Sequence, residues 1–313
     1  MRRVADRGKD MVTTMKDDRE YGGETSVLEV RNLSKQYRGF TLDKVSFTLP
    51  KGYIMGYVGP NGAGKSTTLG LITRTRRAAN GEVLLDGMRY EDDPVLYKEK
   101  IGYVSSMSYF PPGMKVGDAA LLLKQFYPTF SKEKFYHLIR GWNLPEKKKF
   151  STFSTGMMVK LMFAAVLSRE TRLLILDEAT NGLDVLFREE ILNLLQHYIE
   201  DGEHSVLFAT HIIDDLEQIA DYIVMVEGGR VLLQDTKEAL TENYILVKGD
   251  ETLLAVEGIA GCLMGVRRSA YGFSALIHSD NAALLPGGTV LEKPTISQIM
   301  SYLMKAHDKM EME

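Results

Sequence analysis

Residues 59–66 form a phosphate-binding loop of the pattern G-x-x-x-x-G-K-[ST]. An apolar stretch at 53–58 precedes this loop, and a largely apolar run at 67–72 follows it. The order predicts a buried strand, a turn and the opening of a helix. The glycines let successive backbone N–H groups point toward one centre, where they and the positive end of the helix dipole bind a polyphosphate. The sequence therefore predicts a nucleotide-binding protein.

Each residue of the loop has an expected part in that binding. Lys65 supplies a point charge for the outer phosphates, and the hydroxyl of Ser66 is placed to bind Mg²⁺. The expected phosphate-contacting set is Gly59, Pro60, Asn61, Gly62, Ala63, Gly64, Lys65, Ser66 and Thr67. The alternative is a glycine-rich turn without a ligand, and the flanking strand and helix patterns argue against it.

Charged side chains follow two further predicted strands, at 173–176 and 205–209. The first strand ends in Asp177 and Glu178, and the second is followed by Thr210 and His211. Ligands bind at this edge of an open α/β sheet. We predict that Asp177 holds Mg²⁺ with Ser66, and that Glu178 orients and deprotonates the attacking water. Lys65, Glu178 and His211 are the predicted catalytic residues, although a structural histidine remains an alternative for His211.

Continuous apolar strands that alternate with helices predict an α/β fold, with a parallel sheet covered on both faces. The predicted core strands lie at 53–58, 101–104, 173–176, 205–209 and 222–226, the last continuing into a hairpin strand at 230–233. Alternating patterns at 27–30 and 45–49 predict antiparallel strands.

The chain divides into three predicted parts. Residues 1–26 are polar and aperiodic, which predicts a poorly ordered extension. Residues 27–240 carry the nucleotide-fold pattern, with a mostly helical subdomain at about 108–168. Residues 241–313 depart from that pattern and predict a small appendage with a helix at 297–305.

Composition excludes several classes of protein. The formal charge is −4 with no dense basic block, so nothing predicts a nucleic-acid groove, and the cluster Arg74, Arg76 and Arg77 is expected to be a solvated face. The single Cys262 excludes an internal disulfide and fits a reducing compartment. No apolar run reaches the roughly 18 residues of a membrane helix. Work at a membrane would therefore need a partner chain.

A helix start at 153–157, with the sequence FSTGM, carries a further candidate site. Ser154 is a good N-cap for the apolar helix that follows, and Gly156 leaves the first-turn amides open to an anion. A plain helix cap is the alternative, and the residues alone do not decide between the two.

Together these motifs resemble those of the ATP-binding cassette (ABC) ATPases over about residues 27–240. They follow the family's order: the phosphate loop, the signature-like FSTGM, the Asp177-Glu178 strand, the loop 181–184 and the switch histidine His211. Tyr37 matches the aromatic residue that stacks on adenine in this family, a role suited to its flat face.

The resemblance implies a P-loop NTPase of ABC type, with a mixed or parallel sheet core, an antiparallel β-subdomain, a helical subdomain and a small C-terminal appendage. It implies ATP and Mg²⁺ as cofactors. It also implies a head-to-tail dimer with a second ABC subunit, identical or not. Ser154 and Gly156 would then contact the γ-phosphate held by the partner, and Asp184 would lie at the dimer seam.

The chain departs from the family pattern at three places. The usual signature LSGGQ has Thr155 and Met157 at its third and fifth positions here, and Ala179 replaces a common proline. Where the family has a glutamine that contacts Mg²⁺, this chain has Ser105-Ser106, and Gln125 is too far along to replace it. We predict that Ser106 takes that place and acts through water or not at all. In the signature variant and the missing glutamine, the chain is similar to a bacterial subgroup of ABC ATPases that serves ABC-2-type exporter permeases.

The leading hypothesis is the ATPase subunit of a bacterial exporter, cytoplasmic and peripheral on the inner face of the cell membrane. A separate integral-membrane permease would dock on the helical subdomain. The alternative is a soluble ABC ATPase that acts on ribosomes, DNA or cofactor assembly. A single cassette and the absence of sustained heptads between Lys65 and Asp177 disfavour the ribosome and DNA classes. A metabolite kinase is disfavoured by the loop 182–184 together with His211.

Overall fold

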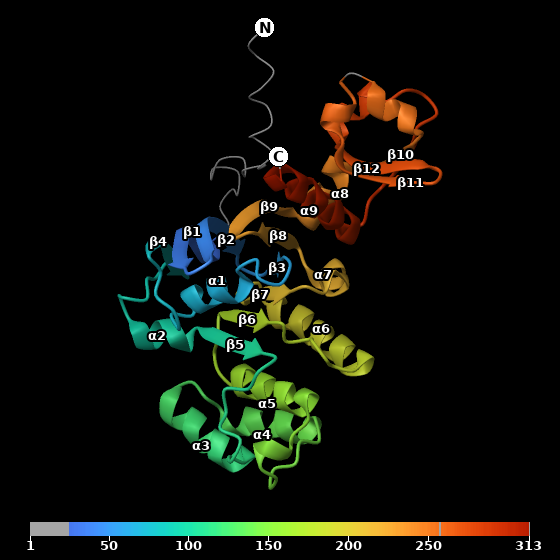
Figure 1. Ribbon diagram of the computed structural model, residues 1–313. Helices are drawn as coiled ribbons and strands as arrows, with labels where there is room; N and C mark the ends of the chain where they lie inside the picture. Colours follow the sequence, from blue (N-terminus) through green and yellow to red (C-terminus); the bar gives the residue numbers. More distant parts are fainter. Residues whose placement is uncertain (1–24, 257, 313) are drawn as a thin grey trace.

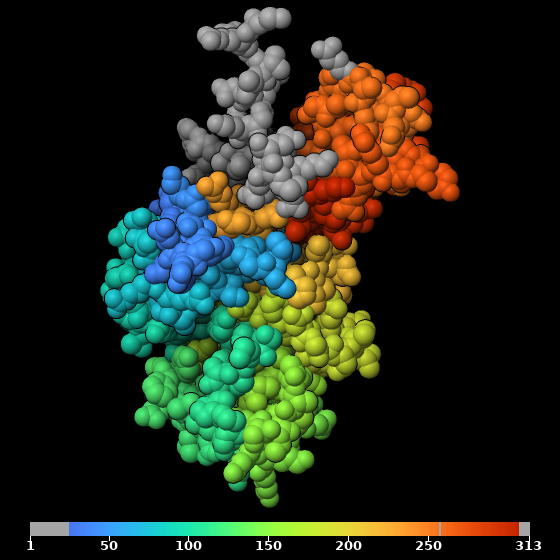
Figure 2. All heavy atoms as spheres, in the orientation of Figure 1, coloured from blue at the N-terminus to red at the C-terminus, as the bar shows by residue number. Residues whose placement is uncertain are grey.

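The computed structural model describes residues 25–256 and 258–312. The extension predicted for residues 1–26 therefore lies almost entirely outside the described residues. In Figure 1 the helical region with α3, α4 and α5 lies at one end of the molecule, and a C-terminal domain with its own sheet lies at the other. The space-filling view separates the same two regions on either side of the central part of the molecule (Figure 2).

The core is a six-stranded sheet in the order β5-β6-β7-β3-β8-β9. Its strands are β3 (Ile54–Val58), β5 (Ile101–Ser105), β6 (Leu173–Asp177), β7 (Ser205–Thr210), β8 (Tyr222–Glu227) and β9 (Arg230–Thr236). The first five are parallel, and β9 pairs antiparallel with β8, as the predicted hairpin requires. Every residue of β3 and β7 is buried, because helices or sheets cover both faces. The predicted α/β class is confirmed.

Two hydrophobic cores lie on opposite faces of this sheet, because successive strand side chains point to opposite sides. One face packs against α1 (Lys65–Ile72), α2 (Pro94–Glu99) and the β-subdomain. The other packs against α5 (Thr155–Leu167), α6 (Val185–Ile199) and α7 (Ile213–Ile219). The adjacent residues Ile54 and Met55 of β3 illustrate the division, since each belongs to a different core.

The β-subdomain is an antiparallel sheet in the order β2-β1-β4. Its strands are β1 (Ser26–Tyr37), β2 (Phe40–Pro50) and β4 (Asn80–Leu85). A hydrogen bond of 2.9 Å from the Asp43 amide to the Gly229 carbonyl joins β2 to the turn between β8 and β9. A Cβ on Gly229 would lie 2.0 Å from the Thr41 carbonyl oxygen, so this close approach needs glycine.

The helical region contains α3 (Val116–Phe126), α4 (Lys132–Gly141), a 3₁₀ turn (Phe150–Thr152) and α5. Buried phenylalanines fill its centre, among them Phe130, Phe135 and Phe150. The single tryptophan, Trp142, donates from Nε1 to Glu190 Oε1 of α6 at 2.7 Å, which ties this region to the core.

The C-terminal domain contains α8 (Lys237–Asn243), an antiparallel sheet in the order β11-β12-β10-β13, and α9 (Ile296–Met312). The strands are β10 (Tyr244–Gly249), β11 (Met264–Ser269), β12 (Gly272–His278) and β13 (Val290–Glu292), with 3₁₀ turns at Glu251–Ala255, Ala260–Cys262 and Ser279–Leu284. The sequence predicted only the last helix. That helix returns to the core, where the Ser297 amide donates to Glu217 Oε1 of α7 at 2.9 Å. The predicted division at residue 240 stays a prediction.

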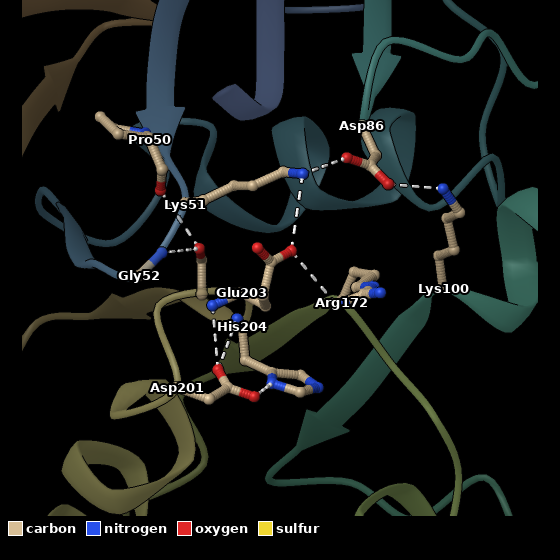
Figure 3. A network of polar contacts seen from close by, with 10 residues as sticks. Pro50, Lys51, Gly52, Asp86, Lys100, Arg172, Asp201, Glu203 and His204 are labelled. Carbon is tan, nitrogen blue, oxygen red and sulfur yellow. Dashed lines mark hydrogen bonds and ion pairs between the residues drawn. The ribbon is translucent and has the colours of Figure 1, made fainter. Parts of the chain in front are cut away.

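A polar network holds the β-subdomain to the amino ends of the core strands (Figure 3). Lys51 Nζ lies 2.9 Å from Asp86 Oδ1 and 3.8 Å from Glu203 Oε2, and Lys100 donates to Asp86 Oδ2 at 2.6 Å. Burial alone would raise the pKa of Asp86. Hydrogen bonds from Lys100 and Lys51 outweigh that effect and hold the pKa of Asp86 below its ordinary value. Lys51, Lys100 and Glu203 precede β3, β5 and β7, at the edge opposite the one where ligands bind.

Candidate nucleotide site

The carboxyl ends of β3, β6 and β7 bring the predicted catalytic groups to one edge of the sheet. The parallel register pairs Val58 with Thr210 and Asp177 with Ala209. Because parallel strands end together, the phosphate loop after β3, the carboxylates after β6 and the histidine after β7 lie side by side. The fold therefore brings the phosphate loop to carboxylates and a histidine that lie more than a hundred residues further along the chain.

The loop before α1 needs its glycines. Gly62 and Gly64 adopt positive φ angles of 88° and 107°, a region that other residues rarely occupy. A Cβ on Gly59 would lie 2.1 Å from the Val226 carbonyl oxygen. Lys65 is only 6% exposed, and its Nζ donates to the carbonyls of Gly59 at 2.7 Å and Pro60 at 3.3 Å. The ammonium group of Lys65 is thus bound by the backbone carbonyls of its own loop.

Glu178 links the lysine to the histidine. Its Oε1 lies 3.4 Å from Lys65 Nζ, and its Oε2 lies 2.8 Å from His211 Nδ1. Asn181 Nδ2 reaches the same Oε2 at 3.4 Å. Glu178 also has a φ of 53°, and a left-handed conformation in a non-glycine residue is the kind of strain that clusters at functional sites. The structure brings together all three predicted catalytic residues.

Asp177 is held between two hydroxyl groups. Ser66 Oγ donates to its Oδ1 at 3.2 Å, and Tyr103 Oη donates to its Oδ2 at 3.0 Å. Burial, and then the negative charge of Asp177, raise the pKa of Tyr103 above its ordinary value, so the phenol stays protonated as a donor. Among the described residues no group of three or more His, Cys, Asp or Glu side chains could hold a metal. One carboxylate and one hydroxyl still fit Mg²⁺, which takes few protein ligands beside substrate phosphates.

Tyr103 is a residue that sequence reasoning missed, because inside strand β5 it resembles any core aromatic. Only the pairing of β5 with β6 places its hydroxyl on Asp177. Ser106 lies at the same edge, where its backbone amide donates to the Asp177 carbonyl at 3.2 Å. Its side chain is exposed. The proposed role of Ser106 in place of the glutamine stays a prediction.

The remaining predicted residues lie in two places. Tyr37, at the end of β1, contacts Arg76, which in turn contacts Thr67 of α1. Ser154 accepts from the Met157 amide at 3.2 Å as the N-cap of α5, and Asp184 accepts from the Phe187 amide at 2.9 Å as the N-cap of α6. In the described part of the chain, neither cap bonds to the phosphate loop.

Gly156 lies beside the loop that ends at Asp184. Among the described residues, and apart from its chain neighbours and the backbone of its own helix, a Cβ built on Gly156 would have one atom within 4 Å, Leu183 Cδ2 at 3.8 Å. The signature-like segment and the loop 181–184 therefore form one neighbourhood, which leaves the backbone around Gly156 open. Their contact with a nucleotide on a second subunit stays a prediction.

A phosphate loop, a carboxylate strand and a histidine at one sheet edge define a P-loop ATPase. A family model described as ABC transporter matches residues 42–181. The ABC transporter ATP-binding protein YtrB of Bacillus subtilis is 30% identical over 223 residues, which cover 71% of this chain and 76% of that protein. The chain therefore belongs to the ATP-binding proteins of ABC transporters.

Two further comparisons agree with this assignment. The bacitracin transport ATP-binding protein BcrA of Enterococcus faecalis is 33% identical over 207 residues, covering 64% of this chain and 67% of the relative. The solved structure of an ATP-binding subunit of an ABC transporter superposes with a TM-score of 0.63 at 27% identity, covering 69% of this chain and 92% of the other. The protein is the ATP-binding subunit of a bacterial ABC transporter and an ATPase. No described helix is long and apolar enough to cross a membrane.

Proposed function

We propose that this protein powers an exporter by closing two cassettes around ATP and releasing them after hydrolysis. The observation that carries the proposal is the contact of Glu178 with both Lys65 and His211, at 3.4 and 2.8 Å. This cluster has a base for water, a cation for phosphate and a group that orients the base.

In the proposed mechanism, a triphosphate draws Lys65 Nζ from the carbonyls of Gly59 and Pro60 to its outer oxygens. Glu178 then loses its ion pair with the lysine, and its carboxylate is free to orient and deprotonate a water molecule. His211 keeps Glu178 in position through the Nδ1–Oε2 contact. Ser66 and Asp177 would hold Mg²⁺, which neutralises charge on the phosphates when bound.

Dimerisation is supported by exposed apolar side chains next to Asp184. Val185 is 78% exposed and Leu186 is 80% exposed, directly at the start of α6. Large apolar side chains exposed together are typical of a contact surface. We propose that this segment, with Asp184, meets a second cassette, and that Ser154 and Gly156 contact the nucleotide bound there.

A separate permease is the proposed membrane partner. Met107 and Tyr109 follow β5 and are 80% and 49% exposed, and Leu121 and Phe126 of α3 are exposed as well. We propose that the permease covers these side chains and that the protein lies on the cytoplasmic face of the membrane. Export is favoured by the signature variant, by the serine pair in place of the glutamine, and by the likeness to a bacitracin transport protein.

Co-purification separates this function from a soluble ABC ATPase. The protein, tagged in its native host, should be recovered from detergent-solubilised membranes with a polytopic integral protein. Replacing Met107 and Phe126 with Ser should remove that partner while ATP hydrolysis by the free subunit stays unchanged. Recovery with ribosomes or an assembly scaffold, and none with membranes, would favour the soluble alternative.

A further inference from the structure

Arg76 occupies a position between the two sides of the nucleotide site. One nitrogen of its guanidinium, Nη1, donates to Tyr37 Oη and to Thr67 Oγ1, each at 3.3 Å. The guanidinium carbon lies 5.9 Å from the centre of the Tyr37 ring, within cation–π range. One cation therefore contacts both the expected base platform and the first turn of α1.

The local chain is built to place this side chain. The Arg76 amide donates to the Gly70 carbonyl at 2.9 Å, which turns the segment after α1 back over the helix. A Cβ on Gly70 would lie 2.9 Å from Arg76 Cδ and 3.1 Å from its Cγ. Glycine inside a helix is unfavourable by about 1 kcal/mol relative to alanine. Here it leaves room for the arginine stem on the helix surface.

Arg76 forms no ion pair within the described part of the chain. No carboxylate there lies within 4 Å of its guanidinium, whereas the neighbouring Arg74 pairs with Glu91 at 3.4 Å. The expectation that all three arginines are solvated was wrong for Arg74, whose side chain is only 18% exposed. Arg76 is exposed, and among the described residues only Nη1 of its guanidinium has hydrogen-bond partners, which leaves most of its donors available. A planar guanidinium in this state is suited to bind phosphate.

The position of Arg76 indicates which phosphate of a bound nucleotide would lie nearest to its guanidinium. Thr67 lies in the first turn of α1, where backbone amides point toward the polyphosphate. Tyr37 lies on the other side, where the base is expected to stack. In a nucleoside triphosphate the α-phosphate is bonded to the sugar. It therefore lies between the base and the outer phosphates. A group that reaches from Tyr37 to Thr67 therefore faces the α-phosphate.

We propose that Arg76 binds the α-phosphate of the adenine nucleotide held by this chain's own phosphate loop. The proposal rests on the proposed function as an ATPase and on the expectation, from the family resemblance, that Tyr37 stacks on the base. Arg76 is thus a binding residue for ATP and ADP alike. It does not act on the γ-phosphate or on the water that attacks it, so its loss weakens binding without slowing the chemical step.

The test compares Arg76→Ala and Arg76→Gln with Arg77→Ala, a matched control at the adjacent exposed arginine. Calorimetric titration should give dissociation constants for ATP and for ADP that rise about tenfold in both Arg76 variants, the loss of one charge-assisted hydrogen bond, and stay unchanged in Arg77→Ala. In steady-state assays KM should rise by the same factor at constant kcat. Arg76→Lys should recover part of the affinity, because it keeps the charge without the planar fork. Melting temperatures without nucleotide should match the wild type.

Three results would overturn the proposal. Equal affinity of Arg76→Ala and Arg77→Ala for ADP would show that Arg76 does not contact nucleotide. Weaker binding of ATP with unchanged binding of ADP would move the contact to the γ-phosphate. An equal loss in Tyr37→Phe, which removes only the hydroxyl, would mean that Arg76 acts solely by orienting Tyr37. If the wild-type protein binds neither nucleotide, the proposed function fails instead.

Discussion

His211 Nδ1 lies 2.8 Å from Oε2 of Glu178, the carboxylate whose other oxygen lies 3.4 Å from Lys65 Nζ. The histidine follows β7 and the glutamate follows β6, so the adjacent positions of these strands in the sheet make this contact possible. It explains how a side chain 33 positions further along can control the geometry of the predicted base.

His211→Ala should lower kcat for ATP hydrolysis by about a hundredfold, because Glu178 would keep its charge but lose the group that orients it. Affinity for ATP should change little, since His211 does not contact the phosphate loop. The control is His197→Ala, at a histidine side chain that is 82% exposed on α6. A variant that hydrolyses ATP at the wild-type rate would remove His211 from the mechanism.

The residues of this site differ in how far the sequence could predict them. Lys65, Ser66 and Glu178 belong to short motifs whose neighbours in the chain are also their structural context, so pattern alone identifies them. Tyr103 and Arg76 carry no such signal. Their roles depend on the pairing of β5 with β6 and on the space above Gly70, which only the folded chain defines.

The same contrast holds for the fold. Continuous apolar strands predict the core sheet, because burial on both faces leaves a strong pattern. The C-terminal sheet was not predicted, because its strands are short and half-buried around a small separate core of Val247, Phe273, Ala275 and Ile277. Its attachment through α9 to α7 depends on contacts such as that of Ser297 with Glu217, which have no sequence motif.

Tyr103→Phe should weaken the affinity of the site for the Mg²⁺ that supports hydrolysis. The phenol donates to Asp177 Oδ2 at 3.0 Å, and loss of such a supporting hydrogen bond costs about ten- to a hundredfold in metal affinity. The concentration of Mg²⁺ that gives half-maximal activity should rise accordingly, with kcat largely recovered at saturating Mg²⁺. Tyr271→Phe, at a residue that is 98% exposed, is the control. An unchanged Mg²⁺ titration would contradict the supporting role of Tyr103.

Asp86→Asn should lower the free energy of unfolding at pH 7 by about 1 kcal/mol, because both lysine contacts of a partly exposed carboxylate are lost. The pKa of Asp86 is lower in the folded protein than its ordinary 3.8, so its contribution is complete above 3.8 and disappears as the pH falls through the folded value. Urea unfolding at several pH values measures this. The difference between wild type and variant should shrink below pH 3.8, and Asp280→Asn, whose side chain is 85% exposed, should show none. A difference that grows on acidification would refute the assignment.

The closing of two cassettes around ATP is tested by the oligomeric state of Glu178→Gln with ATP and Mg²⁺, measured by light scattering on a sizing column. Binding should persist while hydrolysis falls by at least about a thousandfold, since the base is gone but the phosphate loop is intact. The variant should therefore accumulate as an ATP-bound dimer, whereas the control Glu189→Gln hydrolyses ATP and stays monomeric. Monomers of Glu178→Gln with ATP bound would contradict the ATP-driven dimer, and hydrolysis near the wild-type rate would contradict the role of Glu178 as the base.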